Sequence, residues 1–166
     1  TYKYCDHNTC ALIKNNELEQ RIEHRPDTIN WINFAIDSSC NLTCPSCRDS
    51  LQFVNKGPDF EFRMRMSEHI ARLVENHNHW IKFSLSGDGD PFASHVYRHL
   101  LETMDLTNRS DVEIEIITNG ILAERHWPKM TGIHNSVVRF KISFDAGSKS
   151  VYDITRRGGN WEQVLA

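Results

Sequence analysis

Hydrophobic residues recur along the chain in four short runs, in which apolar side chains alternate with polar ones or follow one another directly. The runs cover residues 29–37, 80–86, 111–120 and 136–146, and Gly, Asn, Asp or Ser residues bound them. In the third run, Val112, Ile114 and Ile116 alternate with acidic and other residues. A period of two between turn-forming residues predicts four β-strands.

Between the runs, apolar residues recur at intervals of three and four, which is typical of helices. The predicted helices cover residues 66–77, with Ser67 as the expected N-cap, 94–104, 121–130, 148–155 and 160–166. Pro128 disturbs the third of them, and Gly158 and Gly159 separate the last two. Alternating strands and helices predict an α/β fold with parallel strands. Because a closed barrel needs eight strands, we expect a partial (β/α) barrel, truncated after about four βα units.

The limits of the chain suggest a piece of a longer protein. It begins without methionine, and it stops at "NWEQVLA", within a predicted helix. We divide it into an N-terminal extension, residues 1–28, and a core, residues 29–166.

Composition narrows the function classes. The net charge of −3 offers no basic excess for nucleic acid. No apolar run approaches the roughly 20 residues that span a membrane, and the polar start "TYKYCDHNTC" is no signal peptide. The five cysteines are an odd number, and three of them are crowded together, which favours metal binding in a reducing compartment. We therefore expect a cytoplasmic location.

Three cysteines, Cys40, Cys44 and Cys47, lie in the segment "CNLTCPSC", and none follows them. A zinc site usually adds a second Cys-x2-Cys pair, which is absent downstream. A [4Fe-4S] cluster held by three thiolates would keep one iron open to an external ligand. Both interpretations stay open on spacing alone.

The other unusual segments follow the remaining predicted strands: "SGDGDPF" (86–92), "TNG" (118–120) and "SFDA" (143–146). In parallel α/β sheets, functional groups gather on loops at the carboxyl ends of the strands. We therefore expect these segments and the cysteine loop to lie together at one edge of the sheet.

Together these motifs resemble the radical S-adenosylmethionine (SAM) superfamily. Cys40-x3-Cys44-x2-Cys47 resembles its cluster signature, and residues 87–91 resemble its Gly-Gly-Glu-Pro segment, with Asp90 in place of Glu. Residues 118–120, 143–146 and 156–161 resemble its later strand ends and the stretch before its fourth helix. The resemblance covers residues 29 to 166, with the motifs in the family's order.

The resemblance implies a radical SAM enzyme. Its [4Fe-4S] cluster would bind SAM at the open iron and cleave it reductively to a 5′-deoxyadenosyl radical, which takes hydrogen from a substrate. The substrate is left open between a peptide and a small molecule. The implied partners are SAM and an electron donor such as flavodoxin or ferredoxin, without nucleic acid or membrane.

The resemblance also implies which residues surround SAM. The backbone at Gly87 and Gly89 would approach the ligand, Asp145 would bind the ribose, and Arg156 would pair with the SAM carboxylate. The full set of expected cofactor-binding residues is Gly87, Gly89, Asp90, Thr118, Asn119, Ser143, Asp145 and Arg156. One departure is Ser46, where many relatives have an aromatic residue near the adenine. Phe53 or Phe92 could replace it, although a core position suits each of them equally.

Cys5 and Cys10 precede the core, and their segment resembles the tail of an accessory iron–sulfur module of the SPASM or twitch type, which would hold a second cluster. A zinc site that includes His7, or a pair of reduced thiols, is the alternative. The rival for the whole chain is a non-catalytic module that binds zinc or carries electrons. An electron carrier would need Cys5 or Cys10 as a fourth cluster ligand.

Overall fold

The computed structural model describes residues 30–85 and 88–165. The N-terminal extension with Cys5 and Cys10, and Gly87 of the glycine-rich segment, lie outside the described residues. The division of the chain at residue 29 therefore stays a prediction. No helix in the described part is long and apolar enough to cross a membrane.

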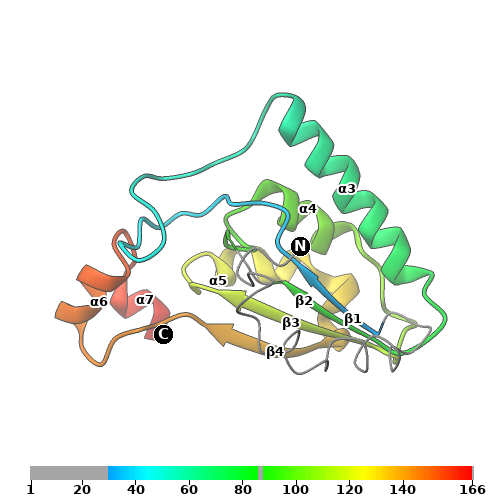
Figure 1. The fold of residues 1–166 in the computed structure, drawn as a ribbon. Coiled ribbons are helices and arrows are strands. Elements are labelled where there is room, and N and C mark those ends of the chain that lie inside the picture. Colours follow the sequence, from blue (N-terminus) through cyan, green and yellow to red (C-terminus); the bar gives the residue numbers. More distant parts are fainter. Residues whose placement is uncertain (1–29, 86–87, 166) are drawn as a thin grey trace, which may run out of the picture.

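One sheet of four parallel strands forms the centre of the fold (Figure 1). The strands are β1 (Trp31–Phe34), β2 (Ile81–Leu85), β3 (Val112–Thr118) and β4 (Val137–Ile142). Their spatial order, β1-β2-β3-β4, follows the chain, and each neighbouring pair is parallel. The α/β fold with parallel strands is thus confirmed, and this order is that of a partial barrel.

The helices connect consecutive strands or follow the last one. They are α3 (Pro58–Glu75), α4 (His95–Thr103), α5 (Ala123–His126), the 3₁₀ helices η1 (Trp127–Lys129) and η2 (Thr131–Ser136), α6 (Lys149–Thr155) and α7 (Trp161–Leu165). Where one helix was predicted over residues 121–130, Pro128 lies at the start of a 3₁₀ turn. The break between α6 and α7 contains Gly158, whose φ of 91° lies in the region that glycine tolerates.

The first helix begins earlier than predicted. It starts at Pro58, whereas the sequence pattern placed its start near Ser67. Proline suits a first helical turn because its missing N–H would have no partner there, and Asp59 and Glu61 favour the positive end of the helix dipole. Ser67 is instead a buried residue within the helix, and its hydroxyl donates to the Met64 carbonyl.

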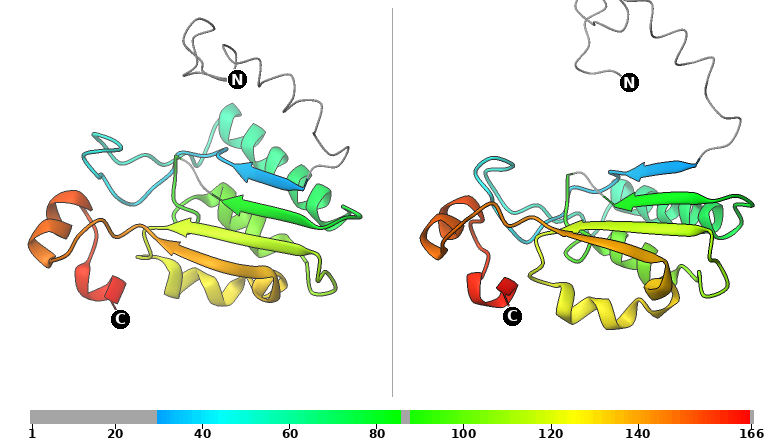
Figure 2. Two further views of the ribbon diagram at one scale, coloured as in Figure 1. Left: turned by 60° about the horizontal axis from the view of Figure 1, so that its bottom comes forward. Right: turned by 90° about the horizontal axis from the view of Figure 1, so that it is seen from below.

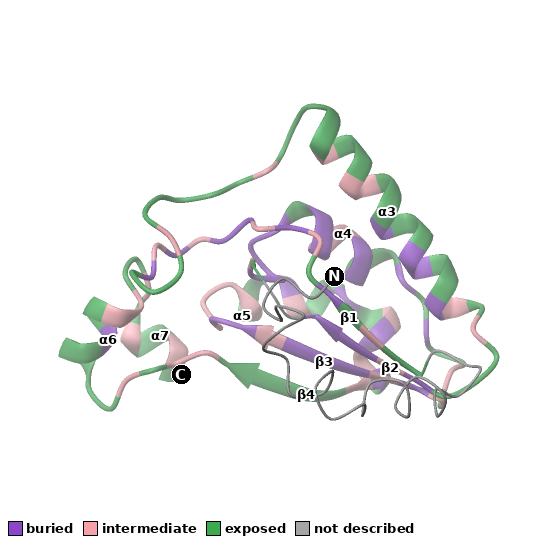
Figure 3. Cartoon of the chain, viewed as in Figure 1, coloured by how far each residue is buried: buried purple, intermediate pink, exposed green. Residues whose placement is uncertain are grey.

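The helices α3 and α4 cover one face of the sheet (Figure 1). The core between these helices and the sheet includes Ile81, Phe83 and Leu85 of β2, which are completely buried. Figure 3 shows this burial in β2 and β3, in contrast to the exposed β4. Phe92 belongs to the same core and stacks near Phe140, which favours the core interpretation of this residue. Phe53 is 50% exposed.

The alternate side chains of the strands point to the opposite face, which we call the open face. It carries Trp31 of β1, Lys82 of β2, Glu115 of β3, and Arg139 and Lys141 of β4, since these residues are neighbours in the strand register. Beyond the carboxyl ends of the strands lie the cysteine loop and the helices α6 and α7 (Figure 2). The segments that carry the candidate functional residues therefore lie at the carboxyl ends of the strands.

Candidate functional site

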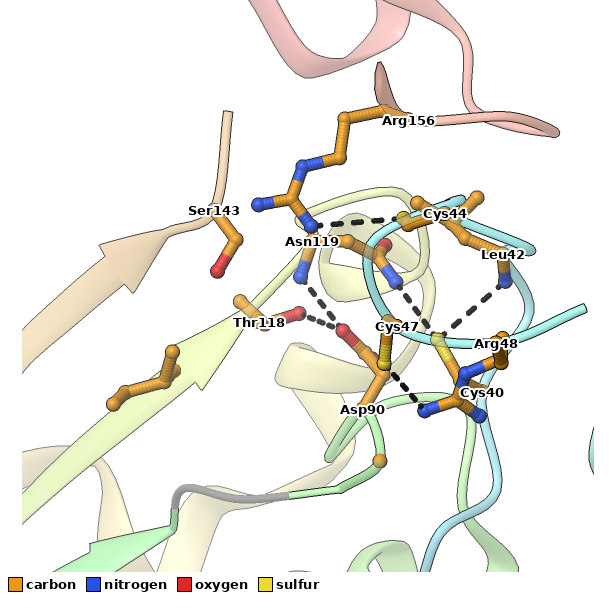
Figure 4. Close-up of a pocket in the computed structure, with 12 residues that line it drawn as sticks. Cys40, Leu42, Cys44, Cys47, Arg48, Asp90, Thr118, Asn119, Ser143 and Arg156 are labelled. Atoms are coloured by element: carbon orange, nitrogen blue, oxygen red, sulfur yellow. Dashed lines mark hydrogen bonds between the residues drawn. The ribbon is translucent and has the colours of Figure 1, made fainter. Parts of the chain in front are cut away.

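A cavity of about 120 Å³ lies at the carboxyl ends of the strands (Figure 4). Its lining residues are Cys40, Leu42, Cys44, Cys47, Arg48, Gly89, Asp90, Ile117, Thr118, Asn119, Ser143 and Arg156. The structure thus brings together all three cysteines of the loop and six of the expected cofactor-binding residues. Asp145 does not line the cavity, and Leu42, Arg48 and Ile117 are additions that the sequence motifs did not identify.

Backbone hydrogen bonds fold the cysteine segment into a closed loop. The Cys40 N–H donates to the Gln52 carbonyl at 2.9 Å, which joins the two ends of the loop. Within it, the Cys47 N–H donates to the Cys44 carbonyl, also at 2.9 Å. These bonds turn a stretch without helix or strand into a fixed support for three sulfur atoms.

The Cys40 sulfur lies between two N–H donors. The Leu42 backbone N–H is 3.5 Å from this sulfur, and the Asn119 side-chain amide is 3.7 Å from it. Burial raises the pKa of the Cys40 thiol, although the Leu42 N–H acts in the opposite direction. A thiolate here would need a further positive partner, which a bound metal provides.

The other two sulfurs each lie near a guanidinium group. Arg156 Nη1 is 3.7 Å from the Cys44 sulfur, and Arg48 Nη2 is 3.4 Å from the Cys47 sulfur. A cationic donor offsets the negative charge of a thiolate that binds a metal. The two arginines therefore supply part of the charge that a set of three thiolates requires.

Asp90 connects the loop after β2 to the end of β3. One carboxylate oxygen accepts from the backbone N–H groups of Phe92 and Ala93, at 3.0 and 3.2 Å. The other accepts from the Thr118 hydroxyl at 2.8 Å and from the Asn119 N–H at 2.7 Å. Asp90 is 2% exposed, and burial raises the pKa of its carboxyl group, while the four donors lower it. Asp90 thus fixes the loop after β2 against the end of β3, and both segments line the cavity.

Gly89 is a glycine because two backbone segments approach closely. A Cβ atom at this position would lie 2.5 Å from the Asp37 carbonyl oxygen and 2.8 Å from that of Ser39. The neighbouring Asp90 N–H donates to the same Ser39 carbonyl at 2.9 Å. We expected a ligand to require this glycine, whereas the residues that exclude a side chain belong to the segment leading into the cysteine loop.

Arg156 and Asp145 form an ion pair at the rim of the cavity. The Asp145 side chain is 66% exposed, and its φ of 51° lies in the left-handed region that Asp adopts more readily than most residues. The Arg156 side chain is 14% exposed, and its Nε atom is buried without a hydrogen-bond partner among the described residues.

A family model for the radical SAM superfamily matches residues 36–166, which is well over half of the chain. The chain belongs to the radical SAM superfamily. Among solved structures, it is similar to a crystal structure of BtrN in complex with AdoMet and 2-DOIA, with 17% sequence identity and a TM-score of 0.44. That match covers 78% of this chain and 56% of the other, so the chain spans little more than half of that protein's length. No curated protein matches the chain.

The cavity of this radical SAM chain fits an iron–sulfur cluster by the chemistry of its donors. Three cysteines that form no disulfide line one space, and each sulfur has at least one N–H donor within 3.7 Å. Such hydrogen bonds to sulfur are among the protein's means of tuning a cluster. In the described ranges, no group of three or more His, Cys, Asp or Glu side chains is arranged to hold a single metal ion.

Among the three cavity-lining residues that the radical SAM motifs missed, Arg48 makes the most polar contacts. Besides its contact with the Cys47 sulfur, its guanidinium donates to the Ser38 carbonyl at 2.6 Å and to the Asp88 carbonyl. It therefore ties the cysteine loop to the loop after β2. A positive residue directly after the third cysteine was the available signal, because a cation stabilises a neighbouring thiolate.

Proposed function

We propose that the chain is the catalytic core of a radical SAM enzyme, in which Cys40, Cys44 and Cys47 bind one [4Fe-4S] cluster. The observation that carries the proposal is the meeting of all three sulfurs with the ends of β3 and β4 around one cavity. When bound, the cluster with SAM at its open iron supplies reductive cleavage of SAM to a 5′-deoxyadenosyl radical. Three protein thiolates leave that iron free, whereas a fourth would close it.

Arg156 is the proposed partner of the SAM carboxylate. Its buried Nε lacks a partner among the described residues, and its Nη atoms are held by Asp145 and by the Cys44 sulfur. A guanidinium fixed in this way would donate to a carboxylate without first losing side-chain freedom. Asp145 then orients Arg156, and its predicted contact with the ribose stays a proposal.

The remaining polar groups of the cavity are proposed to position the rest of SAM. Asn119 and Ser143 line it directly after the ends of β3 and β4, and the Ser143 N–H donates to the Thr118 carbonyl at 2.8 Å. Gly89 and Asp90 shape the wall through the backbone contacts described above. We propose further that the electron donor is a flavodoxin or ferredoxin, that the protein works in the cytoplasm, and that Cys5 and Cys10 belong to a second cluster.

Anaerobic reconstitution with iron and sulfide tests the metal assignment. The full chain should bind about four irons at the cysteine loop. A variant with Cys40, Cys44 and Cys47 changed to Ala should lose them, whereas the matched Cys5→Ala, Cys10→Ala variant should keep the same site loaded. Iron retained at this site in the triple variant would contradict the proposal. Loss of the cluster in the double variant would favour the electron-carrier alternative.

A further inference from the structure

A buried carboxylate surrounded by three cations lies on the open face of the sheet. The Glu115 side chain is 6% exposed. Its Oε1 is 2.8 Å from Lys82 Nζ and 3.2 Å from Arg139 Nη1, and its Oε2 is 3.3 Å from Lys141 Nζ. Three strands thus direct one acid and three basic side chains to a single point.

The positive charge of this cluster exceeds its negative charge. One carboxylate faces three cations, and the other acid on this face of β3, Glu113, contacts the Trp80 indole N–H at 3.4 Å. Arg139 and Lys141 keep 58% and 46% of their side-chain surface exposed. Their charged groups are therefore anchored on Glu115 and still accessible for a further anion.

The cluster adjoins the candidate cofactor cavity. Ile117 and Ser143 line that cavity, and each stands two residues after a member of the cluster, Glu115 on β3 and Lys141 on β4. Side chains two residues apart share a face, and strands rise about 3.3 Å per residue. The cluster therefore begins about 7 Å from the cavity wall, within the length of a small molecule that reaches into the cavity.

We propose that the substrate carries an anionic group, a carboxylate or a phosphate, which binds to Arg139 and Lys141 on the open face. This inference deepens the proposed function and rests on it, because it assigns the cluster to the substrate of the same site. Glu115 holds the cations in place, and Lys82 balances Glu115 from the other side. An anion bound here would place the far end of the substrate toward the cavity, where SAM is proposed to lie.

The alternative is that these four charged side chains only stabilise the sheet by pairing with one another. In that case Glu115 would be the sole intended partner of the cations, and an added anion would find no site. The two interpretations differ in a measurable quantity, which is the affinity of the folded chain for a small anion.

Trp31 offers a local reporter for that measurement. It lies on the open face, where its indole N–H donates to the Ser84 hydroxyl at 3.2 Å. Ser84 is the strand-register partner of Glu115, so an anion near the cluster changes the field at this indole. Trp127 contacts Phe140, whose side chain packs near Phe92 on the face of β4 opposite to Arg139 and Lys141, and Trp161 contacts Phe144, so these two indoles serve as internal controls.

The test titrates the full chain, reconstituted with its cluster, at low ionic strength while the indole ¹H–¹⁵N signals are recorded. One arm uses inorganic phosphate, and the other uses a short peptide with two glutamates and blocked ends. The Arg139→Gln, Lys141→Gln variant removes the charges, and the Arg139→Lys, Lys141→Arg variant keeps them. Arg65→Gln, Arg72→Gln is the matched control, because it removes two exposed cations from the helix α3.

We expect the Trp31 signal to shift saturably in the native chain, in the charge-conserving variant and in the α3 control. The Gln variant should bind the anion about tenfold more weakly or not at all, since each lost contact is a charge-assisted one. A response to phosphate alone indicates a phosphorylated small molecule, and a response to the peptide alone indicates an acidic peptide.

No shift with either probe, or the same affinity in the Gln variant, would overturn the inference. Iron content and SAM binding are measured on the same samples. Their failure would count against the proposed function itself, whereas normal values with no anion binding would count only against this inference.

Discussion

Replacing Asp90 by Asn tests whether this carboxylate holds the candidate site together. Oδ1 can still accept from Phe92 and Ala93 after the substitution. Oδ2, which accepts from the Thr118 hydroxyl and the Asn119 N–H in the native chain, is replaced by an NH₂ group that can only donate. The Thr118 hydroxyl can rotate and accept, but the Asn119 backbone N–H is left facing another donor.

The expected loss follows from these contacts. A hydrogen bond to a charged group contributes about 1.5–3 kcal/mol, and a buried donor left unpaired costs a similar amount. The substitution also removes a buried charge, and burial raises the pKa of Asp90, so part of the loss is offset. We expect the free energy of unfolding to fall by about 1.5–3 kcal/mol.

Urea unfolding of the chain measures this change. Asp88→Asn is the matched control, because Asp88 is exposed and lies two positions away in the same segment. Its effect should stay within about 0.5 kcal/mol. Asp90→Asn should also lower the yield of bound iron, since the displaced Asn119 supports the Cys40 sulfur. Equal unfolding free energies for the two variants would refute the role assigned to Asp90.

Three further predictions concern the surroundings of the site. Tyr97→Phe should lower the unfolding free energy by about 1–3 kcal/mol, because the Tyr97 hydroxyl accepts from the backbone N–H groups of Ile36 and Asp37, at 2.8 and 3.1 Å. An unchanged midpoint of urea unfolding would contradict this prediction. Gly89→Ala should reduce iron binding after reconstitution, because its Cβ would meet the Asp37 carbonyl at 2.5 Å; full iron content would contradict this clash. The pKa of the Glu115 carboxyl group is lowered, and the hydrogen bond from Lys82 is the largest cause. The Glu115 carboxylate should therefore stabilise the fold above the ordinary Glu pKa of about 4.3 and progressively less below it. Urea unfolding of Glu115→Gln should accordingly approach that of the native chain as the pH falls, and a gap that is independent of pH would be inconsistent with the ion pairs.

The period-two pattern was sufficient to predict the sheet. Ile81, Phe83 and Leu85 face the helices because apolar residues of a strand must share one side, and the parallel order follows from the intervening helices. The start of α3 was missed because Phe60, Phe62 and Met64 recur at every second position, which is the period of a strand and not of a helix. Pro58 with the acidic residues after it was the stronger signal.

The site was predictable where its residues belong to motifs and not where they act through the fold. The cysteines and the strand-end segments were expected to meet, and they do. The hydrogen-bond partners of Asp90 could not be predicted, nor could the reason why position 89 requires glycine. Both depend on how closely two loops approach each other in space. The cluster around Glu115 needs strand register as well, since its four charges come from three strands.

Binding of SAM to the reconstituted cluster tests the central proposal most directly. The measurement is the electron paramagnetic resonance spectrum of the reduced full chain, recorded with and without SAM. If SAM binds the iron that Cys40, Cys44 and Cys47 leave open, its addition should change the spectrum of the cluster, and Arg156→Gln should require about 10- to 150-fold more SAM for the same change. A spectrum that stays the same at saturating SAM, on a chain with about four irons, would contradict the account.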